Sequence, residues 1–205
     1  MSKRTSAPQE APSIEQLTAE LKRTRYRRRF AATMRHTLLT LVIIVAAALA
    51  VSYFFLSVMR IHSNAMSPSF RSGDMVVALK NSDYTAGDVI AYYYNDKLLV
   101  KRVIAVEGDT IQVEEDGDVL RNGLKLDEPY VQTRALGQCD IEMPYTVPND
   151  RVFVMGDERD VSLDSRSTAM GCIAQEQVIG RVILRVWPLE DIAYYPSAAE
   201  QTEEE

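Results

Sequence analysis

Two residue types in this sequence could together carry out acyl transfer: serine as a nucleophile and lysine as a base. A serine hydroxyl is a poor nucleophile at neutral pH and must lose its proton as it attacks. Lys101 lies in the run Leu98–Val106, where apolar residues occupy both faces of an expected strand. Because burial disfavours the charged ammonium, we expect a lowered pKa and a neutral amine at Lys101. A lysine that only snorkels at the edge of a sheet would give the same pattern.

The serine that such a base would serve is missing from the place where the surrounding sequence calls for it. The segment Ser63-Asn64-Ala65-Met66-Ser67-Pro68 resembles the active-site motif of type I signal peptidases, in which a serine stands just before the methionine. Three more segments resemble family motifs and follow in family order: Arg71–Asp74 leading into Met75–Val77, Val100–Ile104 with Gly108-Asp109, and Met155–Arg166. The sequence is therefore identified as a member of this family with alanine at the nucleophile position.

The resemblance implies a role for each matching residue. Lys101 would be the general base of a serine–lysine dyad, and Ser162 would bond the lysine amine and orient it. The backbone N–H of residue 65 and the hydroxyl of Ser63 would form the oxyanion hole. An apolar groove would hold a signal peptide extended beside a strand, with shallow pockets for small residues. The supporting residues would be Met66 and Pro68 and the ion pairs Arg102 with Asp157 and Arg166 with Asp164.

Alanine at position 65 has no group that can attack a carbonyl, so we expect the chain as written not to cleave signal peptides at a useful rate. Two explanations stay open. In one, the natural protein has serine at 65, and the alanine was introduced to trap substrate or prevent self-cleavage. In the other, the chain is a natural non-catalytic homologue that acts as a binding or assembly factor for exported or pilus-type proteins. The retained Lys101, Ser162 and Asp164 favour the first.

An apolar segment precedes the motifs. Residues 37–59 contain no charged side chain and are long enough to cross a hydrocarbon core of about 30 Å. A cleaved signal peptide or a buried globular helix are the alternatives, but the run is long for either and no convincing cleavage site follows. Seven basic and no acidic residues lie between Lys22 and Arg35. The positive-inside rule therefore places the N-terminus in the cytoplasm and the part after Arg60 outside the cell membrane.

The net charge of −6 is unevenly distributed. Residues 1–59 carry nine basic and three acidic side chains, whereas residues 60–205 carry 14 and 26. An acidic ectodomain argues against a nucleic-acid partner, and the basic run beside an apolar segment is explained by topology and anionic lipid. Self-cleaving repressors have a similar serine–lysine core, but they would need a DNA-binding domain in place of the apolar segment. The expected partners are signal peptides of secreted preproteins, the lipid bilayer and the secretion translocon.

The remainder of the sequence is typical of β structure. Short runs rich in valine, isoleucine and tyrosine are separated by turn pairs such as Asn95-Asp96, Asp116-Gly117 and Asn122-Gly123. We predict a mainly β fold, a signal-peptidase-like β-ribbon ectodomain with one N-terminal transmembrane helix. The expected strands are Met75–Leu79, Val89–Tyr94, Leu98–Val106, Arg151–Met155 and Val178–Trp187. The expected domains are a cytoplasmic basic segment (1–36), a transmembrane helix (37–59), an extracytoplasmic catalytic domain (60–192) and an acidic disordered tail (193–205).

Cys139 and Cys172 are the only cysteines. A pair outside the cytoplasm suggests a disulfide, and two separate buried thiols are the alternative. His36 and His62 have no ligand-like partners at metal spacing, so we expect no metal and no cofactor.

Overall fold

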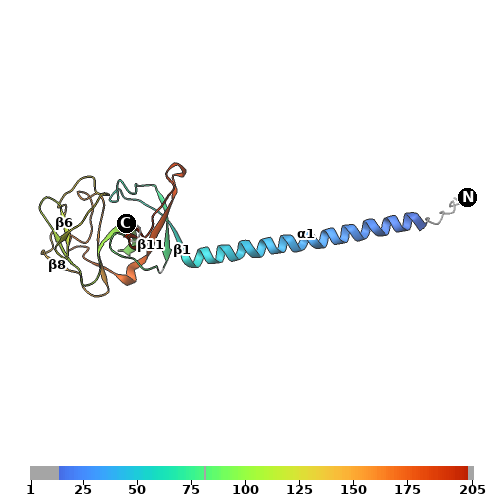
Figure 1. Ribbon diagram of the computed structural model, residues 1–205, viewed down its shortest axis with the longest axis horizontal. Helices are drawn as coiled ribbons and strands as arrows, with labels where there is room; N and C mark the ends of the chain where they lie inside the picture. The colour runs from blue at the N-terminus through green and yellow to red at the C-terminus, as the bar shows by residue number, and fades with distance from the viewer. Residues whose placement is uncertain (1–13, 81, 203–205) are drawn as a thin grey trace, which may run out of the picture. The chain divides into compact units, whose positions relative to one another are not determined.

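The computed structural model describes residues 14–80 and 82–202, and the chain divides into two units, residues 1–50 and 51–205. The helix α1 covers Ile14–Phe55, and from Leu21 onward it is long and apolar enough to cross a membrane (Figure 1). The predicted helical span 37–59 is wrong at its C-terminal end. Leu56–Arg60 instead forms strand β1, which pairs with a neighbouring strand from Leu56↔Leu79 to Arg60↔Met75. Part of the predicted segment 1–36 falls outside the described residues.

Two antiparallel sheets make up the second unit. The larger has the strand order β1-β2-β11-β3-β4-β9-β10, with β12 pairing β11, and the smaller has the order β7-β6-β5-β8 (Figure 1). The strands of the larger sheet after β1 are β2 (Met75–Lys80), β3 (Val89–Tyr94), β4 (Lys97–Ala105), β9 (Arg151–Met155), β10 (Ile173–Ala174), β11 (Val178–Trp187) and β12 (Ala193–Tyr194). The smaller sheet contains β5 (Thr110–Val113), β6 (Val119–Arg121), β7 (Leu124–Lys125) and β8 (Tyr145–Thr146). The predicted mainly β fold is confirmed.

Tight turns fix the register of two hairpins. Asn95 and Asp96 join β3 to β4 with φ of 48° and 59°, and Asn122 and Gly123 join β6 to β7 with φ of 54° and 80°. Positive φ at both central residues is the type I′ geometry, whose twist matches that of paired strands. Both turns lie at predicted turn pairs, and the first one aligns Lys101 with Ile90 across the β3–β4 ladder.

The turn that contains Ala65 is packed onto the larger sheet by its own apolar side chains. Met66 and Phe70 are fully buried against a core cluster that includes Val76 of β2, Val89 of β3 and Val182 of β11. A second cluster includes Ile90 and Val103, which occupy the other side of β3 and β4. The third joins the smaller sheet to β4 and β9. Side chains of both faces of β3 and β4 are therefore buried, as expected for a strand run without polar alternation.

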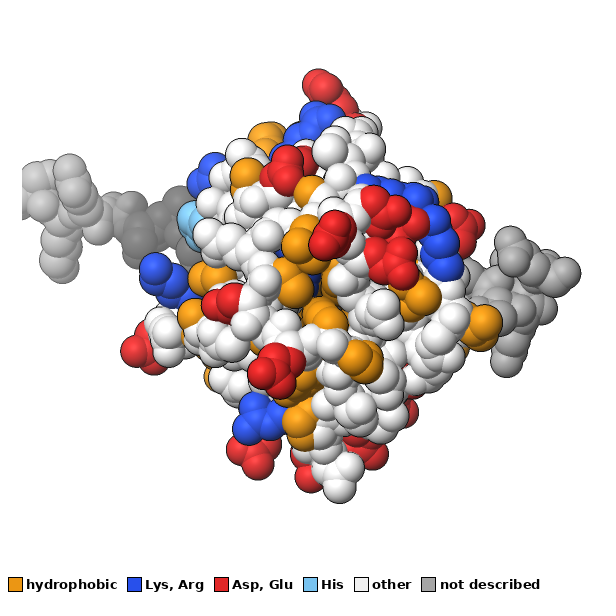
Figure 2. All heavy atoms as spheres, turned by 90° about the vertical axis from the view of Figure 1, so that its left-hand side faces the viewer, with side chains coloured by type: hydrophobic (Ala, Val, Ile, Leu, Met, Phe, Trp, Pro, Cys, Tyr) orange, Lys and Arg blue, Asp and Glu red, His pale blue; other side chains and the backbone are white. Residues whose placement is uncertain are grey.

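Acidic side chains are spread over the face of the second unit that carries β6 and β8 (Figure 2). Between β7 and β9 the chain runs mostly as loops, with only the short strand β8 among them. The expected disordered tail is wrong for residues 193–202. This stretch forms β12, which pairs with β11, and a short helix α2 over Ala198–Thr202, while residues 203–205 lie outside the described part.

Candidate active site

Strand β4 places Lys101 and Arg102 on opposite faces of the larger sheet. Lys101 lies opposite Ile90 and is only 4% exposed. Burial lowers the pKa of the Lys101 ammonium to about 8; the charge of Asp164 opposes this shift, and the charge of Arg166 adds to it. The lowered pKa increases the fraction of Lys101 that is neutral near physiological pH, and the neutral amine is the form that a general base requires.

Ser162 is the hydrogen-bond partner of this lysine. Lys101 Nζ donates to Ser162 Oγ over 2.5 Å, and Ser162 is itself buried. The Ser162 hydroxyl is also bonded to the carboxylate of Asp164. Burial raises the pKa of that carboxyl group, but hydrogen bonds from Arg166, Ser162 and the Gly156 amide outweigh burial and lower it overall. Asp164 therefore remains an anion that fixes the orientation of Ser162.

The Asp164–Arg166 ion pair is completely buried. Arg166 Nε donates to Asp164 Oδ1 over 2.8 Å and Nη2 donates to Oδ2 over 2.9 Å. The rest of the guanidinium donates to the carbonyl oxygens of Leu136 and Arg159. Because every side of this pair is bonded, the loop after β9 that carries Ser162 is held rigidly beside Lys101.

Gly156 lets residue 65 approach that loop. A Cβ atom built on Gly156 would lie 2.3 Å from Ser162 Oγ and 2.4 Å from the carbonyl oxygen of Ala65. The same carbonyl oxygen accepts a hydrogen bond from the Glu158 amide over 3.1 Å. Because Gly156 has no side chain, the carbonyl oxygen of Ala65 and the hydroxyl of Ser162 can both lie close to it.

The predicted oxyanion-hole groups lie together but are bonded to each other. The Ala65 N–H donates to Ser63 Oγ over 3.1 Å, and Ser63 is exposed whereas Ala65 is buried. Met66 is buried below the turn and Pro68 is half-buried within it. A carbonyl oxygen that entered the hole would replace the Ser63 hydroxyl as acceptor of the Ala65 N–H, and that hydroxyl would be free to donate.

On the opposite face of β4, Arg102 and Asp157 form the second predicted ion pair. Arg102 Nε donates to Asp157 Oδ1 over 2.9 Å and Nη2 donates to Oδ2 over 2.7 Å. The hydroxyl of Ser69 donates to the same carboxylate over 2.5 Å, and the guanidinium lies 3.8 Å from the ring centre of Tyr130. The pair therefore ties β4, the turn after Ala65 and the loop after β9 together.

A further buried ion pair was not predicted from the sequence. Arg159 and Glu128 are both almost completely buried and are joined by two hydrogen bonds of 2.6 Å and 3.2 Å. Arg159 Nε also donates to the carbonyl oxygen of Gly156 over 3.0 Å. Arg159 belongs to a recognised motif, but Glu128 lies in a segment without a clear pattern, so no local signal linked the two.

The predicted disulfide is absent: Cys139 and Cys172 are free thiols. Cys172 is buried in the apolar cluster between the two sheets, beside Tyr145. Cys139 lies half-buried in the loop that wraps around Arg166, where its amide donates to the carbonyl oxygen of Gly137. Burial raises the pKa of both thiols, which keeps them protonated at neutral pH.

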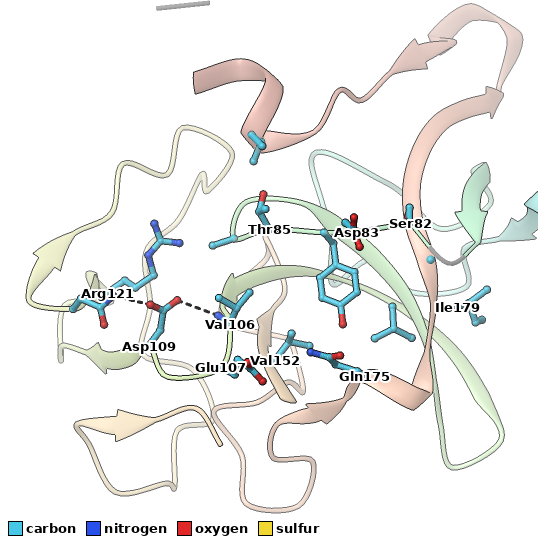
Figure 3. A pocket seen from close by; sticks show the side chains of 17 residues that line it. Ser82, Asp83, Thr85, Val106, Glu107, Asp109, Arg121, Val152, Gln175 and Ile179 are labelled. Carbon is cyan, nitrogen blue, oxygen red and sulfur yellow. Dashed lines mark hydrogen bonds between the residues drawn. The ribbon is translucent and has the colours of Figure 1, made fainter. Parts of the chain in front are cut away.

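Cavities of about 820 Å³ and 400 Å³ lie outside the Lys101–Ser162 pair, and Arg102 and Tyr130 line the smaller one. The larger is lined by Thr85, Asp109, Arg121 and Gln175, as Figure 3 shows, and by Ala198 of α2. Neither of the two is lined by Ala65, Lys101 or Ser162. The Lys101–Ser162 pair is the candidate active site. It joins a buried lysine to its hydrogen-bond partner, and both lie beside the motif around residue 65.

The sequence profile of a family described as "Signal peptidase, peptidase S26" matches residues 34–187. The chain belongs to this family. Signal peptidase IB of Staphylococcus aureus (strain MRSA252) is 29% identical over 186 residues, which cover 78% of this chain and 95% of that protein. The probable signal peptidase I-2 of Synechocystis is 29% identical over 174 residues, covering 79% of this chain and 77% of the relative. A crystal structure of a signal peptidase I from Enterococcus faecalis V583 matches with a TM-score of 0.41 and 28% identity, covering 49% of this chain and 97% of that one.

Proposed function

We propose that this site is built for the removal of signal peptides from exported preproteins by a serine–lysine dyad, and that the chain with Ala65 binds signal peptides without cleaving them. The observation that carries the proposal is the buried Lys101, whose pKa is lowered to about 8 and whose amine is bonded to Ser162. A buried lysine that lacks a carboxylate partner of its own is costly, and catalysis gives it a use.

The reaction needs a hydroxyl at position 65. A serine there would transfer its proton to the neutral amine of Lys101 as its oxygen attacks the carbonyl carbon at the cleavage site. The negative charge on the carbonyl oxygen would be stabilised by the N–H of residue 65 and by Ser63. Lys101 would then protonate the leaving amine, and water would release the acyl group. Loss of the nucleophile costs on the order of a millionfold in turnover in a serine hydrolase, so Ala65 blocks the reaction.

The proposed location is supported by α1 and by the charge distribution. We propose that α1 crosses the cell membrane once, with its basic N-terminal part in the cytoplasm and the β unit outside. In that position the β unit would meet preproteins as they leave the secretion translocon. The bilayer, signal peptides and the translocon are thus the proposed partners.

Restoring the nucleophile tests the proposal. Ala65→Ser in the full membrane-inserted chain should cleave a preprotein after an alanine-containing site, and the rate should rise with pH around pH 8, as the Lys101 ammonium loses its proton. Lys101→Met added to Ala65→Ser should abolish cleavage. Lys97→Met is the matched control, because Lys97 lies exposed on the same strand, and it should leave cleavage unchanged.

Failure to restore cleavage would support the alternative function, that of a binding or assembly factor. If Ala65→Ser folds but stays inactive while the unaltered chain binds a preprotein or a pilus-type subunit, then the protein is a binding or assembly factor. In that case the surface around residue 65 would be the functional surface, and Lys101 and Ser162 would serve only the fold.

A further inference from the structure

The chain continues beyond the part that matches the family and returns to the site. The family profile ends at residue 187, and the following residues form β12, which pairs with β11. The Tyr195 amide extends this ladder by donating to the carbonyl oxygen of Ile183 over 2.8 Å. The extension therefore lies on the same sheet that carries Lys101.

Asp88 fixes the end of this extension. The buried Asp88 carboxylate accepts the Ala198 amide over 2.8 Å and the Ser197 hydroxyl over 3.2 Å, at the start of α2. Gly87, with φ of +104°, comes so close that a Cβ atom there would lie 2.7 Å from the Cβ of Ala198. The segment between β12 and α2 is thus held at both ends.

Tyr195, the first residue of this segment, contacts the turn that carries residue 65. Its ring packs on Phe70 with 4.6 Å between ring centres, and its hydroxyl donates to the carbonyl oxygen of Ser69 over 3.3 Å. Arg185 Nη1 donates to the same carbonyl oxygen over 2.9 Å. Two donors from the C-terminal part of the chain therefore hold the backbone of Ser69.

Ser69 connects these donors to the site. It follows Ala65 in the turn in which the Phe70 amide donates to the carbonyl oxygen of Met66 over 2.8 Å. Its own hydroxyl donates to Asp157, the partner of Arg102. The side chain of Ser69 is thus fixed by the loop after β9, and its backbone is fixed by Arg185 and Tyr195.

We propose that Tyr195 is a positioning residue: through the carbonyl oxygen of Ser69 it sets the place of residue 65 relative to Lys101. The contact to the turn is a property of the folded chain whether or not it is an enzyme. Only its consequence for turnover rests on the proposed function.

Hydrogen exchange tests the contact without any need for activity. In the full chain, Tyr195→Phe keeps the ring on Phe70 and removes only the hydroxyl. Exchange of the Phe70 amide should accelerate about two- to tenfold, the range expected for loss of one neutral hydrogen bond. Tyr194→Phe is the matched control, since Tyr194 is the neighbouring residue and is 61% exposed, and it should change nothing. Equal exchange in the two variants would overturn the proposal.

Kinetics of the same variants in the Ala65→Ser chain test the consequence. Tyr195→Phe should lower kcat about two- to tenfold with KM unchanged, because a displaced nucleophile affects the chemical step. A purely structural effect would lower the yield or melting temperature of the protein without this division between kcat and KM, and such a result would refute the positioning role. If the Ala65→Ser chain is inactive with tyrosine at 195, the proposed function fails, and the exchange experiment still decides whether Tyr195 holds the turn.

Discussion

Gly156→Ala should disrupt the site without removing any group that takes part in it. An ordinary contact distance begins at 3.4 Å, but the new Cβ would lie 2.4 Å from the Ala65 carbonyl oxygen, so one of the two must move by about 1 Å. The other close atom, Ser162 Oγ at 2.3 Å, accepts the hydrogen bond of Lys101. Overpacking of this kind lowers the free energy of unfolding by about 1–3 kcal/mol.

Gly156→Ala should lower the rate of cleavage by more than its modest effect on the free energy of unfolding suggests. A displacement of about 1 Å of a reacting group costs roughly a hundredfold in rate. In the Ala65→Ser chain we therefore expect Gly156→Ala to lower kcat about a hundredfold at a temperature where the protein is fully folded. The assay is cleavage of a preprotein under single-turnover conditions, with thermal unfolding measured in parallel.

Gly171→Ala is the control for this experiment. Gly171 has φ of +64° and no atom within 4 Å of the position of an added Cβ. Alanine there should lower stability by about 1–2 kcal/mol through backbone strain alone and should leave kcat unchanged. If Gly156→Ala kept full activity, or if Gly171→Ala reduced kcat equally, the close approach at Gly156 would not be what positions residue 65.

Three more outcomes follow from the structure. Glu128→Gln leaves the Arg159 guanidinium buried without a counter-charge and should lower the free energy of unfolding by about 3–5 kcal/mol in denaturant titrations, whereas Glu114→Gln at an exposed position should have little effect. Cys139 should react with a thiol reagent in the folded protein without prior reduction and Cys172 only after unfolding; labelling that depends on a reductant would mean that a disulfide forms. Protease added outside intact cells should digest the β unit and leave a fragment ending at about residue 60, and complete protection would contradict the proposed topology.

The strands were largely predictable because their sequences are locally consistent. Val89–Tyr94, Arg151–Met155 and Val178–Trp187 have the predicted bounds, since β-branched and aromatic runs end at turn residues in each case. The end of α1 was not predictable in this way. The apolar residues after Phe55 suit a helix in lipid as well as a strand in a sheet, and pairing with β2 decides between them.

The parts of the site that were missed depend on contacts between distant segments. Glu128 and Arg159 are 31 residues apart, and Ala198 and Asp88 are 110 residues apart. An acidic, alanine-containing tail has the composition of a disordered segment, and only the fold supplies the buried carboxylate that orders it. The lysine environment was predictable because it is created by the apolar neighbours of Lys101 on its own strand.

Because Lys101 and Arg102 are adjacent, the register of β4 against β3 decides which side chain occupies the position of the base. Side chains alternate between the two faces of a strand, so a slip of one residue against β3 would bring Arg102 to the place of the base and move Lys101 to the opposite face of the sheet. A guanidinium remains charged at any physiological pH and cannot accept a proton. A misregistered β4 could therefore keep a well-formed sheet with the same net charge and yet have no group capable of activating a nucleophile.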